Sequence, residues 1–233
     1  MSTQEFAGRV AIVTGASSGI GRATAQLLAS RGAHVMAFAR SEEKLAALAG
    51  ERVRVVAGDV SDANAIERLF AETESHFGDC DILINNAVMV APNRIDKMPI
   101  DDWDRTFVVN VRSAFLTCKR ALPSMIAKRS GTIVNVSSIS GVIGAEKFPG
   151  FTSYNSSKAA LIAFTEALAV EVKDFGVRVN CVSPGSVDTK MWAGVSGGAA
   201  ADMTPQEVAE VILFLASPRS RPMNGQNLHV YSA

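Results

Sequence analysis

Cysteine is scarce in this sequence, and the three that occur are odd in number and widely separated. Cys80, Cys118 and Cys181 form no C-x-x-C pair, so they provide neither a disulfide framework nor a redox or zinc motif. Their flanking residues are typical of buried strands and helices. We therefore expect three buried thiols that act as small hydrophobic side chains in a reducing compartment.

The sequence also lacks long apolar runs, an excess of charge and metal motifs. No stretch approaches the roughly 18 residues of a membrane-spanning helix, and the N-terminus shows no charged-then-apolar signal pattern. The 23 basic residues balance the 23 acidic ones, so there is no general attraction for nucleic acid or an anionic membrane. No H-E-x-x-H motif or Cys/His cluster is present to hold a metal. These absences predict a cytoplasmic protein that binds no nucleic acid, membrane or metal.

Short apolar runs alternate with helical patterns along the whole chain, without a repeat, linker or break in composition. Several of these runs are apolar throughout, as expected for parallel strands covered by helices on both faces. A chain of 233 residues with this pattern is predicted to form one doubly wound α/β domain, residues 1–233, with about seven strands. The expected strands are 10–14, 34–39, 53–56, 82–85, 132–136, 177–182 and 227–230, and the expected helices include 23–30, 63–77, 103–129 and 157–175.

A glycine-rich turn joins the first expected strand to the helix that follows. Glycines let backbone N–H groups approach a pyrophosphate, and the helix N-terminus adds the positive end of its dipole. The spacing is G-x-x-x-G-x-G rather than G-x-G-x-x-G, so an ordinary tight strand-to-helix turn remains an alternative. The turn reads Thr14-Gly15-Ala16-Ser17-Ser18-Gly19-Ile20-Gly21.

The end of the second expected strand bears on the choice of cofactor. An acidic residue there holds the ribose 2′-hydroxyl of NAD, whereas an arginine accommodates the 2′-phosphate of NADP. Ala39 stands where a carboxylate could have been, and Arg40 can bind a phosphate bidentately. NADP(H) is therefore favoured over NAD(H). The nearby Glu42 and Glu43 weaken this preference unless they only begin the next helix.

A second motif, Y-x-x-x-K, begins a long helical pattern at Tyr154. Its i, i+4 spacing places the phenol of Tyr154 and the ammonium of Lys158 on one helix face. The ordinary pKa of tyrosine, about 10, is too high for proton transfer at neutral pH, and a nearby cation lowers it. Taken alone, the motif is weak, and a chance pair on an exposed helix explains it better.

These motifs occur in order with Asn85-Asn86-Ala87, Asn110, Ser138 and Pro184-Gly185. Together they resemble the classical short-chain dehydrogenase/reductase family, in particular 3-oxoacyl-carrier-protein reductases, from about residue 6 to residue 230. The resemblance implies a Rossmann-like domain that transfers a hydride between NADP(H) and a carbonyl or secondary alcohol substrate.

The resemblance also implies catalytic roles. Tyr154 would be the general acid in reduction and the base in oxidation, and Lys158 would lower the tyrosine pKa and bind the nicotinamide ribose. Ser138, preferred to Ser137 because a glycine follows it at the family's interval, would hold the substrate oxygen. Asn110 would anchor a water-linked proton relay through Lys158.

The cofactor contacts implied by the resemblance lie beyond the carboxyl ends of the strands. The glycine-rich turn and Arg40 would meet the phosphates, the segments after the third and fourth strands would flank the adenosine, and the segment after the sixth would close over the nicotinamide. In chain order these residues are Gly15, Ser17, Ser18, Gly19, Ile20, Gly21, Arg40, Asp59, Val60, Asn86, Ala87, Tyr154, Lys158, Pro184, Gly185, Val187 and Thr189.

Four departures from the family pattern concern the substrate side and assembly. Val88 replaces the usual glycine after Asn-Asn-Ala and could crowd the cleft. The long loop 142–153 either shapes the substrate mouth or is a neutral surface insertion. Residues 190–204 would form a short lid with a flexible Gly/Ala-rich stretch, 193–201. The tail 224–233 lacks the family's Asp-Gly-Gly ending, so a homotetramer or homodimer is expected only from the resemblance. The expected substrate contacts are Ser138, Tyr154, Met191 and Trp192.

Three other functions are alternatives to a hydride-transferring oxidoreductase. Extended-branch isomerases and epimerases carry G-x-x-G-x-x-G, and an enoyl reductase would have a lysine where Leu161 stands, so neither fits well. A catalytically silent NADP(H)-binding sensor or scaffold remains the main alternative, because a fold does not by itself define a function.

Overall fold

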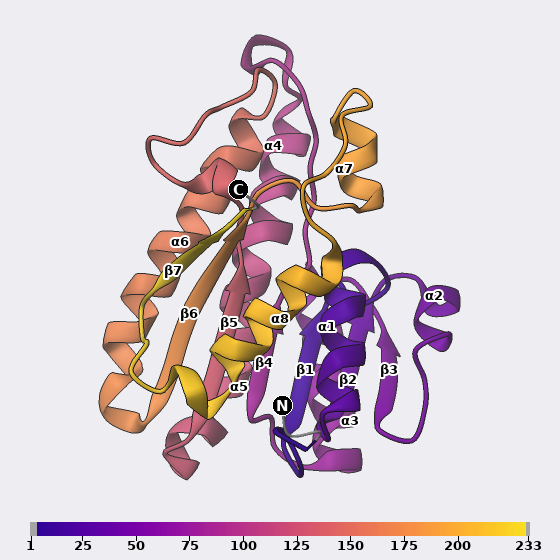
Figure 1. Ribbon diagram of the computed structural model, residues 1–233, viewed down its shortest axis with the longest axis vertical. Helices are drawn as coiled ribbons and strands as arrows, with labels where there is room; N and C mark the ends of the chain where they lie inside the picture. Colours follow the sequence, from indigo (N-terminus) through magenta and orange to yellow (C-terminus); the bar gives the residue numbers. More distant parts are fainter. Residues whose placement is uncertain (1–3, 232–233) are drawn as a thin grey trace.

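The computed structural model describes residues 4–231, which form a parallel sheet with strand order β3-β2-β1-β4-β5-β6-β7 (Figure 1). The order reverses between β1 and β4, which are hydrogen-bonded neighbours through pairs such as Ile12 and Leu83. The strands are β1 (Val10–Thr14), β2 (His34–Ala39), β3 (Val53–Ala57), β4 (Ile82–Asn85), β5 (Gly131–Val136), β6 (Val177–Pro184) and β7 (Asn227–Val230).

Helices cover both faces of this sheet. The α-helices are α1 (Gly19–Ser30), α2 (Glu42–Ala46), α3 (Ala63–Phe77), α4 (Ile100–Phe107), α5 (Ser113–Lys128), α6 (Thr152–Val172), α7 (Lys190–Val195) and α8 (Pro205–Ala216). A π-helical segment, η2 (Val108–Arg112), connects α4 to α5, and short 3-10 turns are η1 (Ile95–Lys97), η3 (Ile139–Gly141), η4 (Lys173–Phe175) and η5 (Pro218–Ser220).

Side-chain alternation along the strands creates two hydrophobic cores. Val13 of β1 packs in the core under α1 and α8, which lie side by side in Figure 1, whereas Ile12 packs in the core under α3, α5 and α6. Both residues are fully buried. Because both faces are covered, the strands contain apolar residues at consecutive positions rather than at every second one. This architecture confirms the predicted single doubly wound, Rossmann-like α/β domain.

The predicted strands agree with the structure to within two residues at their ends, but three helical segments differ. The range 103–129, expected as one helix, is divided into α4, η2 and α5 by the π-helical turn. Helix α7 occupies the first part of the stretch 193–201 that was expected to be a flexible loop. Helix α6 begins at Thr152, five residues before the expected helix 157–175.

The remaining observations concern the cysteines, the membrane and the termini. All three cysteines are buried free thiols, as predicted. No helix within residues 4–231 is both long and apolar enough to cross a membrane. The last two residues of the unusual tail, Ser232 and Ala233, lie outside the described residues.

Candidate active site

A cavity of about 580 Å³ opens beyond the carboxyl ends of the parallel strands. This is the edge at which doubly wound sheets bind ligands, next to the point where the strand order reverses. The segments after β1, β2, β3, β4, β5 and β6 each contribute to its wall. The lining residues are Gly15, Ser17–Ile20, Ala39–Ser41, Lys44, Gly58–Val60, Asn86–Val90, Val109, Val136–Ser138, Tyr154, Lys158, Pro184, Gly185, Val187 and Thr189–Trp192.

Most of the site residues predicted from the sequence lie on this wall. The two exceptions are Gly21 and Asn110, which are buried and do not line the cavity. Sequence reasoning did not assign Ser41, Lys44 or Lys190 to the cavity, although all three line it. No local pattern marks a lysine as cavity-lining, because that depends on where the preceding strand and turn place it.

The glycine-rich turn forms a cradle that side chains would fill. A Cβ on Gly21 would lie 2.3 Å from the amide nitrogen of Asn86 and 2.5 Å from the carbonyl oxygen of Gly15, which leaves no room for it. Gly15 has a φ of +67°, in the left-handed region that favours glycine. The Asn86 amide donates to the carbonyl oxygens of Thr14 at 3.0 Å and Gly15 at 3.3 Å. The turn and the loop after β4 are therefore held together, and the cradle fits a dinucleotide pyrophosphate.

Cationic side chains gather at one end of the cavity, beyond β2. Arg40 and Lys44 both line it, whereas Glu42 and Glu43 lie in the first turn of α2, are exposed and do not line it. The two glutamates therefore only begin a helix, where acidic residues are favoured. Burial alone would raise the pKa of the neighbouring Asp59, but hydrogen bonds from Ser61 and the charges of Arg40 and Arg105 lower it overall.

Tyr154 and Lys158 face the same cavity from the first turns of α6. Both are almost fully buried, at 8% and 2% exposure. The Lys158 ammonium lies 5.7 Å from the centre of the Tyr154 ring and donates to the carbonyl oxygen of Val136 at 2.8 Å. A Cβ on Gly141 would lie 2.6 Å from the carbonyl carbon of Lys158, so this glycine allows η3 to approach α6.

The two serines at the end of β5 have different surroundings. The Ser137 hydroxyl donates to the carbonyl oxygen of Lys158 at 2.8 Å and so joins β5 to α6. The Ser138 hydroxyl accepts from the backbone N–H of Ser140 at 3.1 Å and interacts with Tyr154. Among the described residues, Ser138 does not donate to a backbone carbonyl as Ser137 does, which favours Ser138 as the serine that can bind a substrate oxygen.

Burial shifts the pKa values of the Tyr154–Lys158 pair in a way that the motif did not predict. It raises the pKa of Tyr154, and the Ser138 side chain opposes the rise only in part. It lowers the pKa of Lys158 to about 8, against an opposing effect of Cys181. The expected lowering of the tyrosine pKa by Lys158 is therefore not seen in this arrangement, in which the ammonium is directed toward the Val136 carbonyl.

Asn110 lies at the centre of η2 and is buried at 2% exposure. Its amide oxygen accepts from the N–H of Met89 at 2.8 Å, and its amide nitrogen donates to the Met89 carbonyl at 2.9 Å and the Ser157 hydroxyl at 2.9 Å. The side chain thus holds the loop after β4 against α6. It makes no direct contact with Lys158 among the hydrogen bonds of the described residues, and both N–H donors of its amide are used.

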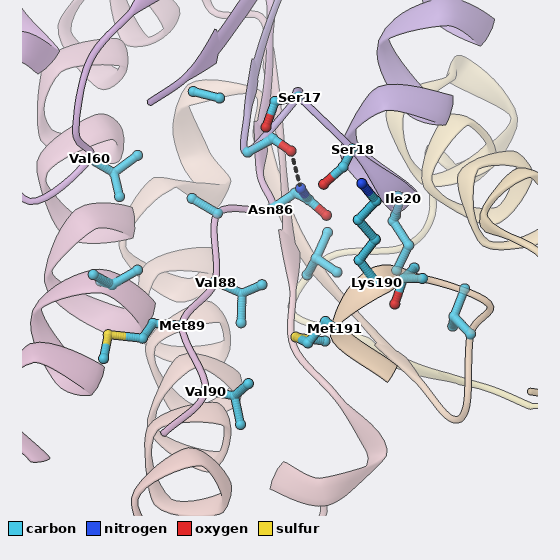
Figure 2. Close-up of a pocket in the computed structure, with 18 of the residues that line it drawn as sticks. Ser17, Ser18, Ile20, Val60, Asn86, Val88, Met89, Val90, Lys190 and Met191 are labelled. Carbon is cyan, nitrogen blue, oxygen red and sulfur yellow. Dashed lines mark hydrogen bonds between the residues drawn. The ribbon is translucent and has the colours of Figure 1, made fainter. Parts of the chain in front are cut away.

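Apolar side chains surround the mouth of the cavity. Figure 2 shows Val88 and Val90 directed toward Met191 across the opening, with Met89 turned the other way. Trp192 also lines the cavity, and its indole N–H donates to the carbonyl oxygen of Ala199 at 2.9 Å. The loop 142–153, expected to shape this mouth, contributes no lining residue within the described part of the chain.

The burial of Lys158 leads to a prediction about stability. Its pKa is about 8 in the folded protein and 10.5 ordinarily, so between these values the unfolded chain binds more protons. The three buried cysteines, whose pKa values burial raises, lower the free energy of unfolding above about pH 9. Lys158 by itself should increase it with pH above about 8, by up to roughly 2–3 kcal/mol at pH 10. Lys158→Met should remove this increase.

Denaturant unfolding of both proteins between pH of about 7.5 and 9.5 measures the difference. Surface groups titrate equally in the two proteins and cancel, and Tyr154, whose pKa is raised, acts in the opposite direction only above pH 10. Parallel stability curves for the two proteins would contradict a buried Lys158 with a lowered pKa.

Comparisons with known proteins agree with this geometry. The family model described as short chain dehydrogenase matches residues 9–199. A 3-oxoacyl-[acyl-carrier-protein] reductase of Vibrio harveyi is 38% identical, covering 96% of each chain. Among solved structures, a short chain dehydrogenase/reductase family protein has 34% identity and a TM-score of 0.88 and covers 97% of each chain. Another, named ribose-5-phosphate isomerase from Brucella melitensis 16M, has 32% identity and a TM-score of 0.91, covering 98% of this chain and 92% of its own.

Proposed function

The chain belongs to the short-chain dehydrogenase family of oxidoreductases, and we propose from this premise that it uses NADP(H) to interconvert a carbonyl compound and a secondary alcohol. The observation that carries the proposal is one cavity with two chemically different ends. One end holds Arg40 and Lys44, and the other holds Ser138, Tyr154 and Lys158. The first set suits a 2′-phosphate and the second suits proton transfer to an oxygen atom.

The residues of the cavity wall divide between the parts of the dinucleotide. The cradle around Gly15 admits the pyrophosphate, Asp59 and Val60 flank the adenine, and Asn86 and Ala87 line the adenosine side. Arg40 and Lys44 neutralise the 2′-phosphate, which is the reason for preferring NADP(H) to NAD(H). The segment from Pro184 to Thr189 borders the nicotinamide. When bound, the nicotinamide ring supplies or accepts the hydride.

The side chains at the other end handle the proton. During reduction, the Tyr154 phenol gives its proton to the substrate oxygen as negative charge develops there, and Ser138 donates a hydrogen bond to the same oxygen. The raised pKa of Tyr154 keeps the phenol protonated but makes it a weaker acid, so proton transfer depends on groups that stabilise the phenolate. Lys158 stabilises the phenolate left behind once its ammonium turns from the Val136 carbonyl toward the phenolic oxygen, and the reverse sequence serves oxidation.

Two structural roles accompany this chemistry. Residues 190–204 act as the substrate lid, with Met191 and Trp192 against the substrate. Homo-oligomer assembly uses α5 and α6, on which Phe115 and Val170 leave 47% and 65% of their surfaces exposed. Light scattering of the purified protein distinguishes a dimer or tetramer from a monomer.

The first experiment follows the absorbance of NADPH and NADH with purified protein and a panel of ketones, aldehydes, sugar phosphates and acyl thioesters, including one carried by an acyl-carrier protein. We expect turnover with NADPH to exceed that with NADH. Tight NADPH binding without turnover of any compound would instead favour the sensor or scaffold function. Isomerisation of a sugar phosphate without nucleotide consumption would contradict both.

A further inference from the structure

Lys190 extends from the first residue of α7 toward the glycine-rich turn on the opposite wall. Figure 2 shows its ammonium ending near Ser18 and Ile20. The same lysine, together with Ser18 and Gly19, also lines a neighbouring groove of about 420 Å³. A Cβ on Gly19 would lie 3.0 Å from the methyl carbon of Thr189, so the two segments approach closely. The Lys190 side chain thus spans the space above the cradle.

The electrostatic surroundings of Lys190 contain more positive than negative charge. Within residues 4–231, it forms no ion pair or hydrogen bond with another side chain. The groove beside it also contains Arg22 and one carboxylate, Asp188. Across from it lie the N–H groups of the turn and the positive end of the α1 dipole. A lysine, an arginine and a helix N-terminus around one space favour an anion there.

We propose that Lys190 is a phosphate ligand that contacts the pyrophosphate of the nicotinamide nucleotide from the side opposite the glycine-rich turn. The inference rests on the proposed function, which supplies the nucleotide. It assigns Lys190 a role distinct from that of Arg40 and Lys44. Those two meet the 2′-phosphate found only in NADP(H), whereas the pyrophosphate is common to NADP(H) and NAD(H).

This contact also positions the substrate side of the cavity. Lys190 is followed directly by Met191 and Trp192, which line the mouth. The two ends of the segment between β6 and α8 are joined by backbone contacts: the N–H of Asp188 donates to the carbonyl oxygen of Met203 at 2.8 Å, and Val187 forms a β-bridge with Met203. Helix α7 therefore carries Lys190 and these apolar side chains together, and a phosphate held by Lys190 would set the position of both.

The experiment compares dissociation constants for NADPH and NADH by titration calorimetry in four proteins. Lys190→Gln removes the charge and keeps most of the side-chain length, and Lys190→Arg keeps the charge. Lys173→Gln is the matched control, because Lys173 is exposed on η4 and does not line the cavity. We expect Lys190→Gln to weaken both nucleotides by the same factor, about 5- to 10-fold, since one charge-assisted contact to an exposed lysine is lost. Lys190→Arg and Lys173→Gln should bind as the unmodified protein does.

The outcomes separate this inference from the proposed function. Unchanged affinity for both nucleotides in Lys190→Gln would overturn the inference. Weaker binding of NADPH with unchanged binding of NADH would also overturn it, because Lys190 would then contact the 2′-phosphate and not the pyrophosphate. An unmodified protein that binds neither nucleotide would instead overturn the proposed function.

Trp192 provides a second readout of the same contact. The chain has two tryptophans, so Trp103→Phe leaves Trp192 as the single fluorescent indole next to Lys190. We expect saturating NADPH to change its emission and its protection from an aqueous quencher, and Lys190→Gln to reduce that change at equal saturation. An identical change in both proteins would show that α7 is positioned without Lys190.

Discussion

Tyr154→Phe should lower turnover by about 10²–10⁴-fold while leaving NADPH binding nearly unchanged. The substitution removes the phenolic oxygen and keeps the ring, which is buried at 8% exposure and packs against Phe151 with ring centres 6.4 Å apart. Ser138 can still bind the substrate oxygen, but no group at that position can give it a proton. The loss should therefore fall on kcat and not on the dissociation constant for the nucleotide.

The measurement is the rate of NADPH oxidation with the best substrate of the panel, together with a nucleotide titration. Tyr231→Phe is a matched control, because Tyr231 is the other tyrosine of the chain, is 61% exposed and does not line the cavity. It should retain the activity of the unmodified protein. Full activity in Tyr154→Phe would contradict the mechanism, even if the choice of cofactor is correct.

Ala39→Asp should reverse the preference between the two nucleotides. Ala39 ends β2, is 7% exposed and lines the cavity next to Arg40. A carboxylate there would face the 2′-phosphate of NADPH, and like charges in contact cost several kcal/mol, equivalent to about 10²-fold or more in affinity. The same carboxylate could accept hydrogen bonds from the 2′-hydroxyl of NADH, so NADH use should improve.

The ratio of kcat/KM for NADPH to that for NADH measures this effect. Ala39→Asn is the matched control, because the amide has the size of the carboxyl group without its charge. We expect Ala39→Asn to reduce use of both nucleotides modestly and to keep the preference for NADPH. An Ala39→Asp protein that still prefers NADPH would show that the 2′-phosphate lies elsewhere than beside Arg40 and Lys44.

The α/β architecture was predictable from the sequence because its signals are local. An apolar strand such as Val10–Thr14 must be buried on both faces, and the glycine-rich turn after it has few other uses. The expected strand ends agree with the structure within two residues at every strand. Helical periodicity, however, did not reveal η2, because a π-helical segment of five residues is too short to interrupt the apolar pattern of the helices on either side.

The members of the site were predictable in part, through motifs that combine residue type and spacing. Tyr154 and Lys158 are one helical turn apart, so their placement on one helix face follows from the sequence. Their pKa values do not, because these depend on burial by distant elements and on the direction of the Lys158 side chain. The motif predicted a lowered tyrosine pKa, and the packing of α6 against β5 produces a raised one.

The sequence by itself therefore determined the sheet, the glycine-rich turn and the Tyr154–Lys158 pair, since each depends on neighbours within a few positions along the chain. Only the tertiary structure decided that Lys44 joins Arg40, that Asn110 holds the loop at Met89, and that Lys190 faces the glycine-rich turn. The contacts of Asn110 and Lys190 join segments that lie far apart in the chain, whereas Lys44 is close to Arg40 in sequence and joins it only through the turn by which the chain leaves β2. The geometry of all three depends on how the strands pair and how each loop leaves the sheet. No local periodicity encodes that geometry, which is why the cofactor-facing lysines became apparent only in the folded protein.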